Sequence, residues 1–400
     1  MPSTGERRVL MLLALASIPF AFVNTLFTQT VSFAADEFDQ GDGAIGVGAA
    51  LVRWGVVLVP PAAVLADRVG RKRVLVAAAW SSPILASLGA LSPSYEWLVA
   101  SQTIARPLAL VMNVMILVML TEEMSRETRA RSVGLVAITS SLGSGAAVLA
   151  LPLADVSPAS WRWLYVIALV FLPVAFVLQR ELAETQRFTR ALAELDTTRV
   201  ARVSRSRLAT QIAASSLTGV FVAAASVYLV NYLRDVRNYD AVMVTTFTIV
   251  TAGPAGLGII VGGRIADDRG RRVVGALSLV LGTALVVVSF STSGAVMWVS
   301  EICGGILLGI SFPALSVYRG EMFPTAHRGA GAALVTASGL IGGSVGLVAA
   351  GQLLDAGWSY SHVMMLLALA PVVVGAIVVT TFPETAHREL EDISPDVVAD

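Results

Sequence analysis

The chain has 400 residues, of which 56% are hydrophobic and 14% are charged, and its formal net charge at pH 7 is zero. Soluble domains carry about 25% charged residues, so this composition excludes an ordinary water-soluble protein. The zero net charge suggests neither a nucleic-acid partner nor an acidic one.

Apolar stretches recur along the whole chain, each close to the roughly 20 residues that a membrane-spanning helix needs. The first six cover residues 9–32, 45–65, 74–92, 96–120, 133–153 and 162–179. Six more cover residues 208–232, 242–263, 273–291, 295–318, 330–354 and 360–382. The sequence therefore predicts an all-α membrane protein with 12 transmembrane helices.

The basic residues are distributed unevenly between the two sides of these spans. Of the 28, 23 lie at the chain ends and in alternate loops, whereas the opposite loops hold only Arg162, Arg234 and Arg237. Cytoplasmic loops are enriched in Lys and Arg, so we expect both termini to be cytoplasmic. Arginine outnumbers lysine 27 to 1, a codon-usage bias that suggests a bacterial protein of the cytoplasmic (inner) membrane.

The first span has an alternative interpretation as a secretory signal peptide. Arg7 and Arg8 precede an apolar stretch, and the small residues Ala34 and Ala35 offer a cleavage site. Cleavage there would leave eleven spans, so we favour a retained first helix.

Charged segments repeat along the chain with an offset of about 200 residues. Residues 66–73 read ADRVGRKR and residues 266–273 read ADDRGRRV, each after the second span of its set. Glu122 precedes Arg129 as Glu321 precedes Arg328, and the pair Glu184-Thr185 returns as Glu384-Thr385. An internal repeat of this kind predicts two homologous halves. We expect six-helix halves at 1–180 and 208–383, a basic cytoplasmic linker at 181–207 and a cytoplasmic tail at 384–400.

These motifs resemble those of the major facilitator superfamily, and the resemblance covers nearly the whole chain. Its signature between spans two and three is matched by Asp67, Arg68, Gly70, Arg71 and Lys72, with Ala63 in place of the usual leading Gly. The second copy keeps Gly263, Asp267, Gly270, Arg271 and Arg272, with Asp268 in the first Arg position. Residues 321–329 and the Pro-Glu-Thr at 383–385 resemble motifs of the sugar-porter and metabolite/proton-symporter branches. The resemblance implies two pseudo-symmetric halves.

The resemblance also implies that the loop charges control access to a transport pathway. A carboxylate and a guanidinium at span ends can form an ion pair, and glycine permits a tight turn between helices. Such contacts would stabilise one access state. The implied gating residues are Asp67, Arg68, Gly70, Arg71, Glu122, Arg129, Asp267, Gly270, Arg271, Glu321, Arg328 and Glu384.

Three charges lie inside predicted spans, where insertion costs about 2.5–3.5 kcal/mol and a charge is therefore a functional candidate. They are Arg53, Arg106 and Glu301. We predict that Arg106 and Arg53 bind an anionic substrate group while Glu301 takes up and releases a proton. The repeat aligns Glu301 with Ser101, one turn from Arg106, so the two could face each other across the pathway. The alternatives are a structural ion pair, or a Glu301 that reaches the outer surface.

Uncharged polar residues inside spans are further candidates for substrate binding. They are Asn24, Gln29, Asn113, Tyr228 and Asn231. Each could instead hydrogen-bond a neighbouring helix, so both interpretations stay open.

The sequence lacks the residues that metal sites, nucleotide-binding sites and enzyme active sites require. A single cysteine, Cys303, and three histidines at positions 327, 362 and 387 have no metal-ligand spacing, so we expect no metal and no cofactor. No nucleotide-binding motif is present, so an ion or solute gradient should supply the energy. No nucleophile–base arrangement supports an enzyme, and no signalling domain supports a sensor.

The sequence therefore predicts a secondary active transporter that moves a small organic solute by alternating access, in proton-coupled uptake (symport) of a metabolite. The alternative is proton-driven efflux of a drug or metabolite. The fifth span has Gly143 and Gly145 without a following proline, unlike drug/proton antiporters, which favours the metabolite porter. The expected partners are the solute, protons and the lipid bilayer, with no nucleic acid, and we expect a monomer.

Overall fold

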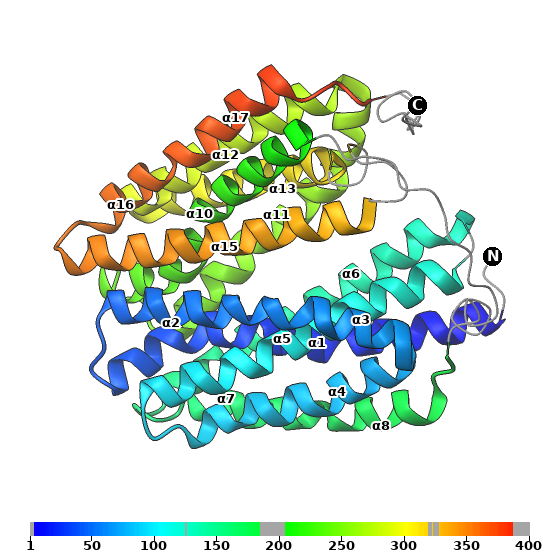
Figure 1. Ribbon diagram of the computed structural model, residues 1–400. Coiled ribbons are helices and arrows are strands. Elements are labelled where there is room, and N and C mark those ends of the chain that lie inside the picture. Colours follow the sequence, from blue (N-terminus) through cyan, green and yellow to red (C-terminus); the bar gives the residue numbers. More distant parts are fainter. Residues whose placement is uncertain (1–3, 125, 185–204, 319–321, 323–327, 387–400) are drawn as a thin grey trace. The chain divides into compact units, whose positions relative to one another are not determined.

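The computed structural model describes residues 4–124, 126–184, 205–318, 322 and 328–386, and all regular structure in these ranges is helical (Figure 1). The first part of the chain forms α1 (Thr4–Glu37), α2 (Asp42–Trp54), η1 (Gly55–Leu58), α3 (Val59–Val69), α4 (Arg71–Ser87), η2 (Leu88–Leu91), α5 (Tyr95–Glu123), α6 (Arg126–Leu149), η3 (Leu151–Asp155), α7 (Arg162–Ile167), η4 (Ala168–Phe171) and α8 (Leu172–Glu181). The second part forms α10 (Arg205–Asp235), α11 (Ala241–Arg269), α12 (Arg271–Ser291), α13 (Gly294–Ser316), α15 (Arg328–Asp355), α16 (Tyr360–Leu367) and α17 (Leu369–Thr381).

These elements form 12 helical segments long and apolar enough to cross a membrane within the described ranges. Their bounds follow the apolar stretches closely; for example, the stretch predicted at 96–120 is Tyr95–Leu120, and that at 273–291 is Arg271–Ser291. The predicted all-α fold with 12 transmembrane helices is confirmed.

Three spans change helix type near prolines. In the second span, α2 ends at Trp54, η1 follows, and α3 begins at Val59, directly before Pro60 and Pro61. Proline has no N–H and its ring clashes with the preceding turn, so α-helical hydrogen bonding is interrupted there. Pro152 in η3 and Pro173 at the start of α8 accompany the same change in the fifth and sixth spans.

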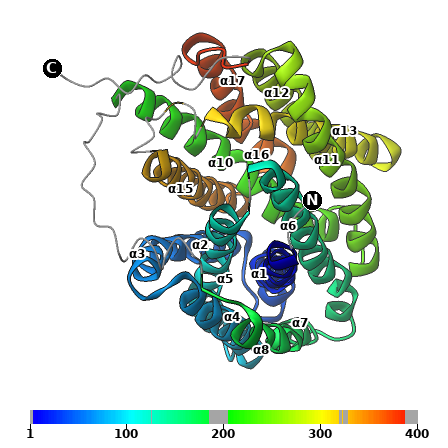
Figure 2. The same ribbon diagram turned by 90° about the vertical axis from the view of Figure 1, so that its right-hand side faces the viewer.

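The chain divides into two compact units. Unit 1 comprises Met1–Gly41, Leu51–Thr197 and Asp240–Thr245. In unit 1, α1 packs against α5 and α6, and α4 packs against α5 (Figure 2). Buried side chains from α1, α4, α5 and α8, among them Leu13, Leu75 and Met112, form its core.

Unit 2 comprises Asp42–Ala50, Thr198–Tyr239 and Thr246–Asp400. Here α10 packs along α15, and α12 packs along α13 and α17. The core joins Leu279 and Val378 to an aromatic pair, Tyr318 and Phe382, whose ring centroids are 5.0 Å apart. The first turns of α2 thus belong to unit 2, while the rest of that span belongs to unit 1.

Candidate functional site

Two arginines inside the spans of unit 1 lie close together. Arg106 of α5 donates a hydrogen bond from Nε to Oδ1 of Asn24 on α1, over 3.0 Å. Just after Arg53, the second span packs closely against α5. A Cβ added at Gly55 would lie only 2.3 Å from Cγ of Pro107, the residue after Arg106. Arg53 is close enough to Arg106 for the two positive charges to repel each other. Two like charges therefore share one polar region of the bundle.

Neither guanidinium is neutralised by the part of the chain that the structure describes. The ion pairs there involve other arginines, and Arg53 Nε is buried without a hydrogen-bond partner. Gln29 Oε1, on α1 of the same unit, is also buried and unpartnered in these ranges, and Asn113 is half-buried on α5. A buried charge without a counter-ion costs several kcal/mol. This region can therefore stabilise an anionic group.

Glu301 of α13 lies in unit 2 and faces α12. Its carboxylate accepts a hydrogen bond of 2.5 Å from the hydroxyl of Ser289. The backbone carbonyl of Ser289 also lies 3.2 Å from the hydroxyl of Tyr232, which in turn accepts from Arg237. Glu301 thus belongs to a polar network of α10, α12 and α13. Arg106 belongs to the other unit.

Tyr228 and Asn231 of α10 contact the first turn of α2. The Tyr228 hydroxyl lies 2.8 Å from the backbone carbonyl of Asp42, and Asn231 Nδ2 donates to the Asp42 carboxylate over 3.2 Å. These contacts join helices within unit 2. A role for either residue in substrate binding stays a prediction.

In unit 1 the turn after the second span brings several loop charges together. Gly70 has a φ of 109°, a conformation that favours glycine. Arg71 Nη2 lies 3.4 Å from Glu122 Oε1, and Glu184 accepts a hydrogen bond from the backbone N–H of Lys72 at the start of α4. Arg68 is exposed. The side chains of Asp67 and Arg129 lie outside the described part of the structure.

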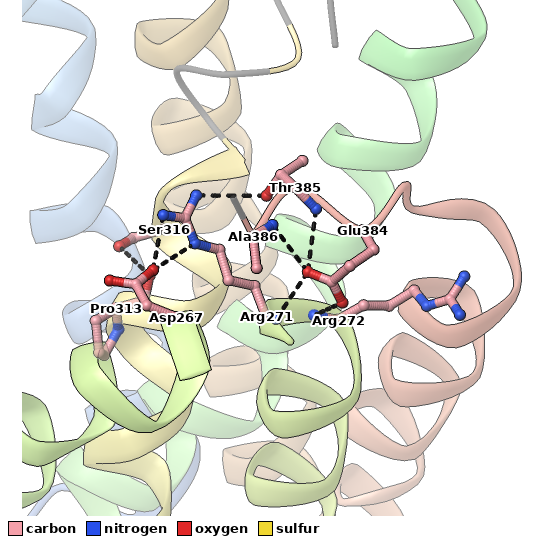
Figure 3. Close-up of polar contacts among 8 residues, drawn as sticks. All are labelled: Asp267, Arg271, Arg272, Pro313, Ser316, Glu384, Thr385 and Ala386. Carbon is pink, nitrogen blue, oxygen red and sulfur yellow. Dashed lines mark hydrogen bonds and ion pairs between the residues drawn. The ribbon is translucent and has the colours of Figure 1, made fainter. Parts of the chain in front are cut away.

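In unit 2 the equivalent turn has the same geometry (Figure 3). Gly270 has a φ of 94°, and Glu384 accepts backbone hydrogen bonds from Arg271 and Arg272, over 2.9 and 3.2 Å, at the start of α12. Arg271 Nη2 pairs with Asp267 over 2.8 Å. Glu321 and the side chain of Arg328 lie outside the described residues.

Partial burial acts to raise the pKa of the Glu384 carboxyl, but backbone N–H donors lower it by more. The donors belong to Ala386, Arg271, Arg272 and Thr385. The net pKa therefore lies below the ordinary Glu value, and the carboxylate stays ionised as a cap for α12.

A second pair of repeat-related caps was not predicted. Asp355 at the end of α15 accepts from the backbone N–H of Gly43 over 3.0 Å, in unit 2. Asp155 at the end of η3 accepts from the backbone N–H of Ala241, in unit 1. The two aspartates are 200 residues apart, so the offset already found in the loops would have identified them.

The sequence matches the model of the Major Facilitator Superfamily over residues 13–300 and 241–395. The chain belongs to this superfamily. It is therefore a multi-pass membrane transporter. No curated protein sequence matches the chain.

Solved structures share the fold at low sequence identity. The inward-open xylose transporter XylE from E. coli is 16% identical with a TM-score of 0.77, and 97% of this chain and 99% of that chain are covered. A bacterial homologue of the human lysosomal transporter Spinster, inward-facing and unoccupied, is 13% identical with a TM-score of 0.74, covering 95% and 97%. The nucleoside transporter NupG is 13% identical with a TM-score of 0.69, covering 95% and 99%.

Proposed function

We propose that this secondary transporter moves a small organic anion by alternating access, as proton-coupled uptake. It would lie in the cytoplasmic membrane with both termini in the cytoplasm. The observation that carries the proposal is the pair Arg53 and Arg106, two neighbouring guanidiniums inside spans whose described surroundings contain no paired carboxylate. A carboxylate on the solute would supply the missing negative charge, and Asn24 would orient Arg106 toward it.

Proton coupling is assigned to Glu301. It is a carboxylate inside a span, and a neighbouring hydroxyl, that of Ser289, donates to it. Support for uptake comes from the Pro-Glu-Thr motif and from the shared fold of a D-xylose–proton symporter, which is 16% identical with a TM-score of 0.77. Glu301→Gln should abolish uphill accumulation while solute exchange continues, because exchange needs no net proton movement. Unchanged accumulation would contradict this role.

The anion site is tested by binding of carboxylic acids, each paired with its neutral amide, to the purified protein. At least one acid should bind, and its amide should bind much more weakly. Losing a charged hydrogen bond costs about 1.5–3 kcal/mol, so Arg106→Ala should weaken binding of the acid by about tenfold or more. Arg73→Ala, at an exposed arginine in the first turn of α4, is the matched control and should leave binding unchanged. Equal binding of acid and amide would refute the proposal.

A further inference from the structure

Three helices of unit 2 bring two carboxylates to one tyrosine. Asp42 begins α2, Asp235 ends α10, and Tyr360 begins α16. The Tyr360 hydroxyl oxygen lies 3.3 Å from both carboxylate oxygens of Asp42 and 3.1 Å from Oδ2 of Asp235. Asn231 Nδ2 donates to Oδ1 of Asp42 over 3.2 Å. None of the roles already assigned explains this arrangement.

The start of α2 is held firmly against its neighbours. Asp355 caps the backbone N–H of Gly43, and the Asp42 carbonyl accepts from Tyr228. A Cβ added at Gly46 would lie 2.4 Å from the carbonyl oxygen of Leu347, so only glycine permits this approach of α2 to α15. The position of the Asp42 carboxylate is therefore set by packing of its backbone.

The hydrogen atoms in this cluster do not suffice if both aspartates are ionised. A phenol carries one hydrogen, and it can be donated fully to only one of the two carboxylates. The other contact would then place two acceptor oxygens together with no hydrogen between them. A proton on Oδ2 of Asp42 removes this conflict. Asn231 then donates to Asp42, Asp42 donates to Tyr360, and Tyr360 donates to Asp235, so a hydrogen joins each neighbouring pair of side chains.

The surroundings of Asp42 also favour an additional positive charge. The titratable groups that face it are Asp235 of α10, Asp355 of α15, Tyr228 of α10 and Tyr360 of α16. Within the described ranges no cationic side chain forms an ion pair with Asp42. Asn231 is 3% exposed, and its Oδ1 is buried with no donor in those ranges. Around Asp42 itself, the described acceptor atoms therefore outnumber the described donors.

An additional proton fits this excess of acceptor atoms better than a metal ion does. The described residues contain no group of three His, Cys, Asp or Glu side chains that could hold a metal. In unit 1, by contrast, a carboxylate at a helix end has a cationic partner. Glu37 at the end of α1 pairs with Arg162 and accepts a hydrogen bond from Trp161 Nε1 over 2.6 Å. A carboxylate with an arginine partner needs no proton.

We propose that Asp42 and Asp235 share one proton through Tyr360, and that this shared proton holds the start of α2 in unit 2. Loss of the proton to water would leave two carboxylates competing for one hydroxyl and would release the first turns of α2. The site lies at the end of α2–α3 opposite Gly70, on the side of the spans that lacks the arginine-rich loops. A role of the shared proton in transport rests on the function proposed above. The presence of that proton between Asp42 and Asp235 does not.

The test is infrared difference spectroscopy of the purified full-length protein in lipid nanodiscs during a pH titration. Wild type should show the carbonyl band of a buried protonated carboxylic acid. Asp42→Asn should lose that band, since its amide can donate to Tyr360 as the acid does and so preserves the contacts. Asp240→Asn is the matched control: Asp240 is exposed and caps Met243 at the start of α11, and asparagine is also a good cap. It should keep the band.

Three further variants keep the test decisive. Tyr360→Phe removes the acceptor of the acid, so the band should shift in frequency or disappear. Glu301→Gln and Arg106→Ala should both retain it, even if no transported anion is found. If Asp42→Asn removes no component of the band, or if Glu301→Gln removes the whole band, the proposal is overturned.

Discussion

Replacing Glu384 by glutamine removes a charge from the start of α12 while preserving the shape of the side chain. The carboxylate accepts from the backbone N–H groups of Arg271, Arg272, Thr385 and Ala386, at 2.9–3.2 Å. An amide keeps one acceptor oxygen, and its NH2 group would face donors. Losing a helix cap costs about 0.5–2 kcal/mol, and losing a charge at a helix N-terminus costs about 0.3–1 kcal/mol. Because Glu384 is partly exposed, we expect a total of about 1–2 kcal/mol.

The dependence of this loss on pH identifies its cause. The pKa of Glu384 lies below the ordinary value, so its contribution is complete above the unfolded-state pKa of about 4.3 and is lost as the pH falls through the lower folded value. The difference in unfolding free energy between wild type and Glu384→Gln should therefore be largest near neutral pH and shrink in acid.

The assay is unfolding by SDS in mixed micelles, measured between acidic and neutral pH. Asp268→Asn is the control, because Asp268 is an exposed carboxylate nearby, in the last turn of α11. It should change the unfolding free energy by less than about 0.5 kcal/mol. A Glu384→Gln variant as stable as this control, or a loss that stays constant with pH, would refute the capping argument.

Other substitutions test the remaining contacts. Gly46→Ala should destabilise the packing of α2 in unit 2 by about 1–3 kcal/mol, because a Cβ would overlap the Leu347 carbonyl. Gly145→Ala is the control, since its Cβ would enter open space and should not destabilise the protein. SDS unfolding compares the two variants. Glu122→Gln weakens the half-buried contact with Arg71, so it should increase solvent exchange of the amides at the start of α4, measured by hydrogen–deuterium exchange; unchanged exchange would argue against a structural role.

Hydropathy and charge were sufficient to predict the 12 spans, because membrane insertion imposes length and composition on each helix separately. The repeat identified the turns at Gly70 and Gly270, where positive φ requires glycine-like freedom. These features depend on local sequence. The caps by Glu184 and Glu384 also follow the 200-residue offset, although their partners, the backbone amides of Lys72 and Arg271, carry no side-chain signal.

The cluster around Asp42 could not be predicted in the same way. Asp42 stands at the entrance of a span, where a carboxylate at a helix N-terminus needs no special explanation. Its significance comes from Tyr360 and Asp235, which lie about 318 and 193 residues further along the chain and meet it only when three helix ends converge. Tyr228 and Asn231 were identified from their positions in a span, but the structure shows them in contact with Asp42.

We propose that this protein transports an organic anion together with protons through a site that contains Arg106. The most direct measurement is solute-induced proton movement in proteoliposomes, using carboxylic acids, their amides, sugars, amino acids and cationic drugs. We predict proton entry with at least one acid, none with its amide, and its loss in Arg106→Ala but not in Arg73→Ala. Proton exchange driven by drugs, or acid-driven proton entry that survives Arg106→Ala, would contradict this mechanism.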